Sequence, residues 1–261
     1  MFSRGSAPYN YILVGLLMVL GTTPLMAAEE GEQSGAEQSP PAEEATPAPS
    51  KWDGAAELGF IMNRGNTETE TLNAQFRVEN TRAKWLHRAE FKVLQASEQE
   101  TTTAESYELS GRSEYSLDDN DYLFGSLRYE DDRFAGYDRR TTEVVGYGHQ
   151  YLKREDMTLK GEFGVGSRQS KNTDGSSDSE GIARVGLDYK WQITDTSSFG
   201  ETVYVEHGEN NTYTESVTAV TAKINNSLAM KVSYTIKDNS DPQPGFENTD
   251  TRTAVTLVYD F

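Results

Sequence analysis

Apolar and polar side chains alternate along most of the chain after residue 50. In the segment 106–117, Leu109 and Tyr115 share one face, whereas Glu108 and Arg112 share the other. A helix would scatter these charges around its circumference, but a strand places successive side chains on opposite faces. The same division recurs in 157–166 and 183–191. This period of two predicts β-strands.

The alternation predicts an all-β chain with about twelve antiparallel strands in up-and-down order. The expected strands cover residues 52–62, 70–80, 84–95, 104–117, 121–131, 140–151, 157–169, 179–192, 197–208, 213–225, 227–238 and 248–261.

The expected connections alternate in length. Short ones contain 80–81, 118–120, 154–156, 194–196 and 225–226. Longer ones surround 65–66, 98–103, 136–138, 172–178 and 241–245, and the connection near 209–211 is shorter than the rest of its class. Turns at one end and loops at the other are typical of a transmembrane outer-membrane β-barrel. With an even number of strands, both ends of the barrel chain lie on the periplasmic side.

The apolar face decides between a membrane barrel and a soluble one. A soluble periplasmic barrel or sandwich buries its apolar side chains, whereas a membrane barrel turns them outward to lipid. The segments reach the roughly 9–11 residues that a tilted crossing requires. Aromatic residues such as Trp85, Tyr115 and Trp191 gather near strand ends, as in the girdles at lipid–water boundaries. We therefore expect insertion in the outer membrane, with lipid and lipopolysaccharide as partners.

The opposite face carries charges of both signs, and burial of so many ions in a dry soluble core would be costly. In a barrel lumen they can pair and keep some hydration. The sequence therefore predicts a lumen charge network of Arg77, Glu79, Arg88, Glu90, Glu108, Arg112, Glu114, Lys160, Glu162, Arg184, Asp188 and Lys190. Two carboxylates, Glu143 and Glu201, fall instead on the expected lipid face, and we place both toward strand ends, where the cost is smaller.

The chain before residue 51 differs in composition from the strands. Residues 1–28 resemble a secretory signal peptide, with Arg4 before a short apolar run and Ala27 or Ala28 as a cleavage position. Residues 29–50 are rich in Glu and Pro and have no basic residue, which predicts a disordered periplasmic linker. The barrel would then occupy 51–261.

Composition narrows the classes of function. Acidic residues outnumber basic ones 42 to 24, a formal net charge of −18, which argues against nucleic acid as a partner. The chain has no cysteine and three histidines, so neither a disulfide nor a thiolate metal site is available. We expect no metal and no cofactor.

The C-terminus alternates apolar residues back from a terminal aromatic ring, through Val255, Leu257, Tyr259 and Phe261. This resembles the signal by which outer-membrane proteins are recognised for assembly. We therefore expect the barrel-assembly machinery to be a partner through the last strand.

A short motif after the first expected strand contains Gly65, Asn66, Thr67 and Thr69. It resembles the G-N-T-x-T opening of the salt-induced outer membrane protein family, a largely uncharacterised group of bacterial barrels. The similarity spans most of residues 52–261. It implies an outer-membrane location in a Gram-negative envelope and a link to salt or osmotic stress. The family has no agreed catalytic residues.

Three classes of function stay open. An enzyme acting on lipid or peptide would need a histidine beside Ser or Asp at one rim. His87, His149 and His207 all fall on the lipid face, and no two are expected to meet. A structural or salt-stress role in the envelope is the preferred interpretation.

A narrow channel for small solutes is the main alternative, because about twelve strands enclose a lumen narrower than that of a porin. Cations and anions nearly match on the inward face, so we expect low conductance and weak selectivity. The longer loops are acidic, which allows loose binding of divalent cations beside lipopolysaccharide phosphates.

Overall fold

The computed structural model describes residues 50–63, 69–99, 101–132 and 135–261. The expected signal peptide, the linker up to residue 49, and Gly65, Asn66 and Thr67 of the family motif lie outside these described residues.

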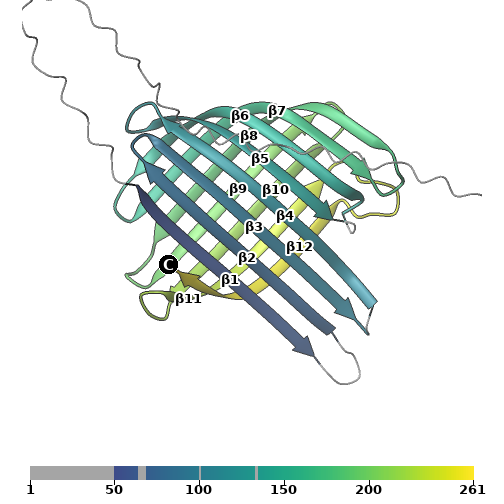
Figure 1. Cartoon of the computed structure of the whole chain (residues 1–261), viewed down its shortest axis with the longest axis horizontal. Coiled ribbons are helices and arrows are strands. Elements are labelled where there is room, and N and C mark those ends of the chain that lie inside the picture. Colours follow the sequence, from purple (N-terminus) through teal and green to yellow (C-terminus); the bar gives the residue numbers. More distant parts are fainter. Residues whose placement is uncertain (1–49, 64–68, 100, 133–134) are drawn as a thin grey trace, which may run out of the picture. The chain divides into compact units, whose positions relative to one another are not determined.

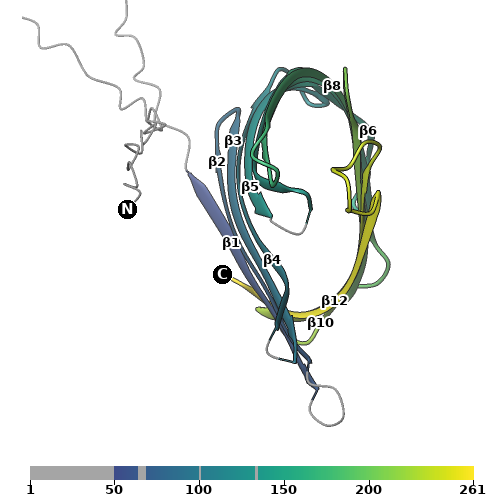
Figure 2. The ribbon, with the colours of Figure 1, turned by 90° about the vertical axis from the view of Figure 1, so that its right-hand side faces the viewer.

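Within the described ranges the chain forms twelve strands. They are β1 Lys51–Asn63, β2 Thr69–Arg82, β3 Trp85–Glu98, β4 Thr101–Ser116, β5 Asp121–Asp132, β6 Tyr137–Lys153, β7 Met157–Asn172, β8 Ser177–Gln192, β9 Ser197–Gly208, β10 Thr212–Lys223, β11 Leu228–Asn239 and β12 Thr249–Asp260. Neighbours in sequence pair in order, and β12 returns to pair with β1, which closes an antiparallel barrel (Figures 1 and 2). The predicted fold is confirmed.

Residues 240–248, between β11 and β12, form the one clearly longer connection between the strands described here, and the other connections at the two ends of the barrel have similar lengths. We call the end with the turns at 83–84, 117–120, 154–156, 193–196 and 224–227 the turn mouth, and the opposite end the loop mouth. The longer loops expected at 98–103, 136–138 and 172–178 are wrong, because β4 already begins at Thr101, β6 at Tyr137 and β8 at Ser177. Threonine favours extended backbone, and Thr101 and Thr102 continue the ladder with β3 before a register shift at Thr103.

Large apolar side chains point outward from the sheet. Leu109 is 55% exposed, Phe163 62% and Leu187 51%. Buried positions inside the barrel instead include Arg128, Glu130 and Glu206. A soluble protein buries its apolar side chains and exposes its charges, so this arrangement is the reverse. It matches a barrel whose outer surface faces lipid. No helix with the length and hydropathy needed to cross a bilayer occurs among the described residues.

Aromatic rings cluster outside the barrel close to the turn mouth. Trp85 opens β3 and packs against Tyr115 near the end of β4, with ring centroids 4.9 Å apart. Tyr259 stacks on Phe261 at 6.2 Å, next to the end of β12. Amphipathic rings at one level of a barrel fit the boundary between acyl chains and head groups.

The seam between β1 and β12 is closed by a short ladder. Four residue pairs run from Ala55 with Asp260 to Leu58 with Leu257. Beyond them, Phe261 and Gly54 exchange two backbone hydrogen bonds of 2.9 Å each. A Cβ at Gly54 would collide with the Phe261 ring, so glycine there lets the terminal ring lie flat across the seam. The outward positions Val255, Leu257, Tyr259 and Phe261 are all exposed.

Candidate functional site

Charged side chains from several strands meet inside the barrel in two groups. The first, which we call the inner network, lies nearer the turn mouth and consists of Arg112, Glu114, Tyr122, Lys160 and Glu162. Arg112 on β4 contacts Glu162 on β7 at 2.5 Å and Glu114 at 2.7 Å. Tyr122 donates to Glu162 at 2.7 Å. These contacts tie together strands that are not neighbours in the sheet.

Glycines on β6 make room for the aromatic rings of the inner network. A Cβ at Gly148 would overlap the ring of Tyr122, and one at Gly146 would overlap that of Phe124. The Arg112 guanidinium lies 4.2 Å from the Phe124 ring centroid, within cation–π range. The two glycines of β6 thus leave space for the Tyr122 and Phe124 rings of β5. The Phe124 ring in turn faces the Arg112 guanidinium.

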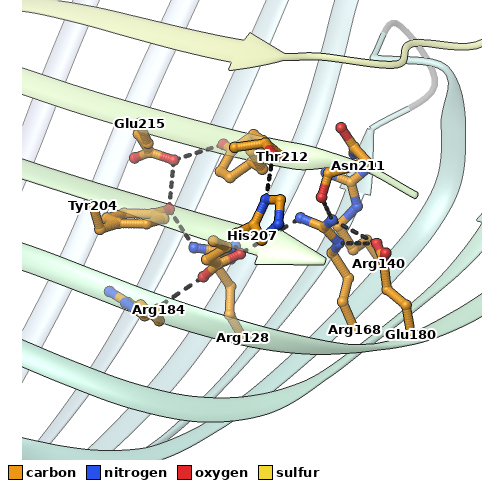
Figure 3. A network of polar contacts seen from close by, with 12 residues as sticks. Arg128, Arg140, Arg168, Glu180, Arg184, Tyr204, His207, Asn211, Thr212 and Glu215 are labelled. Atoms are coloured by element: carbon orange, nitrogen blue, oxygen red, sulfur yellow. Dashed lines mark hydrogen bonds and ion pairs between the residues drawn. The ribbon is translucent and has the colours of Figure 1, made fainter. Parts of the chain in front are cut away.

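The second group, which we call the outer network, lies nearer the loop mouth. Its members are Arg128, Glu130, Arg168, Arg184, Tyr204, Glu206, Glu215 and Lys237 (most are labelled in Figure 3).

Glu206 on β9 is the fully buried centre of the outer network, with an exposed fraction of 0%. Its carboxylate lies 3.0 Å from Arg128, 3.5 Å from Arg184 and 3.9 Å from Arg168. Arg168 also contacts Glu180 at 2.5 Å and donates to the Asn211 carbonyl at 2.8 Å (Figure 3). Three guanidinium groups thus converge on one carboxylate.

Arg128 connects this centre to the far wall. It donates to the Tyr204 hydroxyl, and Tyr204 donates to Glu215 on β10 at 2.7 Å. Arg128 also contacts Glu130 at 3.1 Å, and the other oxygen of Glu130 lies 3.7 Å from Lys237 on β11. Since β5 and β11 lie on opposite sides of the ring of strands, the outer network crosses the whole lumen.

A loop covers the same end of the barrel. Residues 240–248 connect β11 to β12, and Ser240 donates to the side chain of Asn211 at 3.1 Å. Phe246 of this loop reaches Gly136, because a Cβ built there would stand 3.3 Å from the Phe246 ring. The β11–β12 loop therefore spans the loop mouth from the β9–β10 connection to the β5–β6 connection.

Below the outer network the lumen holds a cavity of about 390 Å³, which we call the chamber. Its wall includes members of both networks, with Tyr204 and Glu215 toward the loop mouth and Lys190 toward the turn mouth. Nine Arg and Lys residues line it, against six Asp and Glu. Four further carboxylates, Glu57, Glu79, Glu130 and Glu206, lie just outside this lining and pair with lining cations. The count therefore does not contradict the nearly matched charge expected of the inward face.

The structure places the twelve residues of the predicted charge network on inward positions of β2, β3, β4, β7 and β8. Arg88 pairs with Glu79 at 2.7 Å, and Glu90 and Glu108 both contact Lys92, at 2.8 and 3.0 Å. Arg112, Glu114, Lys160 and Glu162 meet in the inner network, whereas Arg184 joins the outer one. Asp188 and Lys190 pair at 3.8 Å, and Arg77 lines the chamber.

The most buried members of the outer network were missing from the sequence prediction. Tyr204 and Glu206 alternate with the outward Val203 and Val205, so the period of two does assign them to the lumen. Both residues contact Arg128 on β5, which makes them central to the outer network. The sequence pattern along β9 does not predict these contacts. The polar residues at inward positions of β5, β9, β10 and β11 were the sequence feature that could have identified the members of the outer network.

The three histidines lie on outward positions of different strands. Ring nitrogens of His87 and His207 lie 2.9 Å from the Ser113 hydroxyl and 2.8 Å from the Thr212 hydroxyl. His149 contacts Asp121 at 2.5 Å. Each thus has a separate partner. Over the described residues, no group of three or more His, Asp or Glu side chains is arranged to hold a metal ion.

The two carboxylates on the outer face have different surroundings. Glu201 is the fifth residue of the 12-residue strand β9 and accepts hydrogen bonds from Ser216 at 2.8 Å and Thr218 at 2.5 Å. Glu143 is exposed and is the seventh residue of the 17-residue strand β6. The predicted place of both toward strand ends is therefore wrong, since alternation along a strand assigns a face but not a depth.

Comparison with known proteins gives similarities both in sequence and in structure. Uncharacterized protein YdiY of Escherichia coli (strain K12) is 32% identical over 213 residues, which cover 80% of this chain and 82% of that protein. A structure of the NanC porin has a TM-score of 0.50 at 11% identity and covers 80% of this chain and 98% of its own. An outer membrane channel from Pseudomonas putida F1 has a TM-score of 0.49 at 9% identity, covering 86% of this chain and 100% of its own.

The likeness to the NanC porin extends to the barrel fold alone. A family model matches residues 56–261, nearly all of the strands described above. Its description does not mention salt, so the predicted link to salt stress stays a prediction. The chain belongs to the family described as "Protein of unknown function, DUF481".

Proposed function

We propose that this protein is an integral barrel of the Gram-negative outer membrane whose lumen is blocked by its own side chains, with a structural or salt-stress role in the envelope. The outward apolar face and the aromatic rings near the turn mouth support the location. Recovery in detergent-soluble outer membranes, with gel mobility that changes on heating, tests it. Recovery in the soluble periplasmic fraction contradicts the location.

The outer network is the observation that carries the blocked lumen. Glu206 has no exposed surface, and the chain of contacts from Arg184 through Arg128 to Lys237 reaches across the barrel. Buried ion pairs of this kind are held by several partners at once, so breaking one is costly. Thermal motion of single side chains is therefore insufficient to open a steady path.

Planar-bilayer recording tests the blocked lumen. The wild type is expected to give no steady open level. A variant with Arg128→Ser, Tyr204→Ser and Glu206→Ser removes the centre of the outer network and is expected to conduct. The control carries Arg154→Ser and Glu155→Ser in an exposed turn and should behave as the wild type. Equal, steady conductance in all three proteins contradicts the proposal.

The second candidate is a narrow channel for small solutes. The chamber favours it, because about 390 Å³ is the size of a small-molecule site. For a solute to pass through the lumen, the β11–β12 loop and the side chains of the outer network would have to move aside. A steady current from the wild type would select this function.

A further inference from the structure

The chamber has access to solvent at one end. The Lys190 side chain, two residues before the end of β8, keeps 65% of its surface exposed, although it lines the chamber. From the loop mouth, access to the chamber is blocked by the buried side chains of Arg128 and Glu206 and by the β11–β12 loop. A solute would therefore reach the chamber through the turn mouth.

The chamber wall carries charges of both signs. Nine cationic and six anionic side chains line it. Just outside this lining, Glu79 pairs with Arg88, Glu57 with Lys231, and both Glu130 and Glu206 with Arg128. Any preference for an anionic solute therefore depends on the lining cations that these carboxylates leave without a close partner.

Three of the chamber's cations are only loosely paired. Lys160 lies 3.9 Å from Glu114, Lys190 lies 3.8 Å from Asp188, and Arg184 lies 3.5 Å from Glu206. By contrast, the pairs of Arg112 and Lys92 measure 3.0 Å or less. The buried Nε of Arg184 has no hydrogen-bond acceptor in the described part of the chain. Donor capacity thus stays available on one wall.

These three cations share the wall formed by β7 and β8. Lys160 stands opposite Asp188 in the ladder, and Asp188 already accepts a hydrogen bond from Thr202 at 3.1 Å. The carboxylate between Lys160 and Lys190 is therefore partly occupied by another donor. An anion placed here could take both ammonium groups as partners.

We propose that the chamber binds a small solute with two or more carboxylate or phosphate charges, held by Lys160 and Lys190 and admitted through the turn mouth. Arg184 lies six residues from Lys190 along β8, about 20 Å, and stacks on the Tyr204 ring at 4.2 Å, so it stays with the outer network. Ammonium and guanidinium groups form charge-assisted hydrogen bonds with either type of oxygen. The chamber volume limits the ligand to about the size of a disaccharide. This inference goes beyond the proposed function, because a blocked barrel needs no ligand.

Calorimetric titration of the full chain, folded in neutral detergent, tests the proposal. The probes are citrate for carboxylates, pyrophosphate for phosphates, and neutral sucrose as the size control. Binding of citrate or pyrophosphate is expected, weakening as NaCl rises, and none is expected with sucrose. The stronger of the two anions identifies the preferred chemistry. No heat with either anion, or equal binding of sucrose, overturns the proposal.

Variants locate the site within the chain. Lys190→Gln changes an exposed side chain and should not impair folding, and Lys160→Gln removes the second ammonium group of the site, whose pair with Glu114 is long at 3.9 Å. Each is expected to weaken anion binding at least fivefold, whereas Lys153→Gln, the same change in an exposed residue at the end of β6, should leave it unchanged. Heat-modifiable gel mobility checks that each variant folds. Equal weakening by all three, or by none, overturns the assignment to the chamber.

Binding and conductance are separate measurements. Titration in detergent requires neither a bilayer nor an open lumen, so a failure to bind leaves the blocked barrel intact. A wild-type current would instead refute the blocked lumen without affecting the titration.

Discussion

Glu206→Gln is the sharpest perturbation of the outer network. The substitution keeps nearly the same volume but removes the charge on which three guanidinium groups converge, at 3.0, 3.5 and 3.9 Å. Since the carboxylate is fully buried, water cannot replace it. Removing one partner of a buried ion pair typically costs about 3–5 kcal/mol, because the remaining charge stays uncompensated.

The remaining contacts of each arginine set the expected magnitude. Arg168 keeps Glu180 and the Asn211 carbonyl, and Arg128 keeps Glu130. Arg184 loses its ion-pair partner but can turn toward the chamber. We therefore expect the lower end of the range, a loss of about 3 kcal/mol in the free energy of unfolding.

Urea unfolding in lipid vesicles, followed by tryptophan fluorescence, measures this loss. The control is Glu209→Gln, the same change at an exposed position in the β9–β10 connection, with an expected effect within about 0.5 kcal/mol. A double variant with Arg184→Gln and Glu206→Gln should lose at least about 1 kcal/mol less than the two single losses added together. An unfolding free energy for Glu206→Gln as close to the wild type as that of Glu209→Gln would refute the reasoning.

Three further changes test other parts of the fold. Gly148→Ala displaces the Tyr122 ring and should cost about 1–3 kcal/mol in urea unfolding, whereas Gly125→Ala, with open space around its Cβ, should cost nothing; equal costs would contradict the packing. Phe261→Ala should lower the yield of heat-modifiable barrel more than Phe60→Ala, a similarly exposed ring away from the Gly54 contact, and equal yields would remove the role of the seam. Glu143→Leu should stabilise the barrel in vesicles by about 1 kcal/mol, because it removes an exposed carboxylate from the apolar face. Glu201→Leu should not stabilise it, since Ser216 and Thr218 lose their acceptor, and a gain equal to that of Glu143→Leu would show that those hydrogen bonds contribute little.

Local alternation was sufficient to predict the architecture. The segment predicted at 197–208 coincides with β9, because Val203 and Val205 alternate with Tyr204 and Glu206 over its length. A one-residue slip would exchange the two faces of a strand, so a sheet with one apolar face fixes its own register. For this reason the inward positions follow from sequence. The strand ends follow less closely, since β3 runs three residues past its predicted end and β4 and β6 each begin three residues early.

Contacts across the lumen could not be predicted in this way. Arg128 and Glu206 are 78 residues apart, and their meeting depends on the cross-section of the closed barrel. Which charges line the chamber is likewise a property of a three-dimensional grouping. Along the strands, Arg and Lys nearly balance Glu and Asp, and only the folded ring decides which of them share a cavity.

Spin labels measure the orientation of the faces most directly. Because the chain has no cysteine, single substitutions at positions 184, 185, 186 and 187 of β8 can each carry one nitroxide without a background label. In vesicles, collisions with lipid-soluble oxygen should be frequent at 185 and 187 and rare at 184 and 186, a period of two with the apolar positions outward. The reverse pattern, or equal oxygen access at all four positions, would contradict a barrel with its apolar face in lipid and its charges in the lumen.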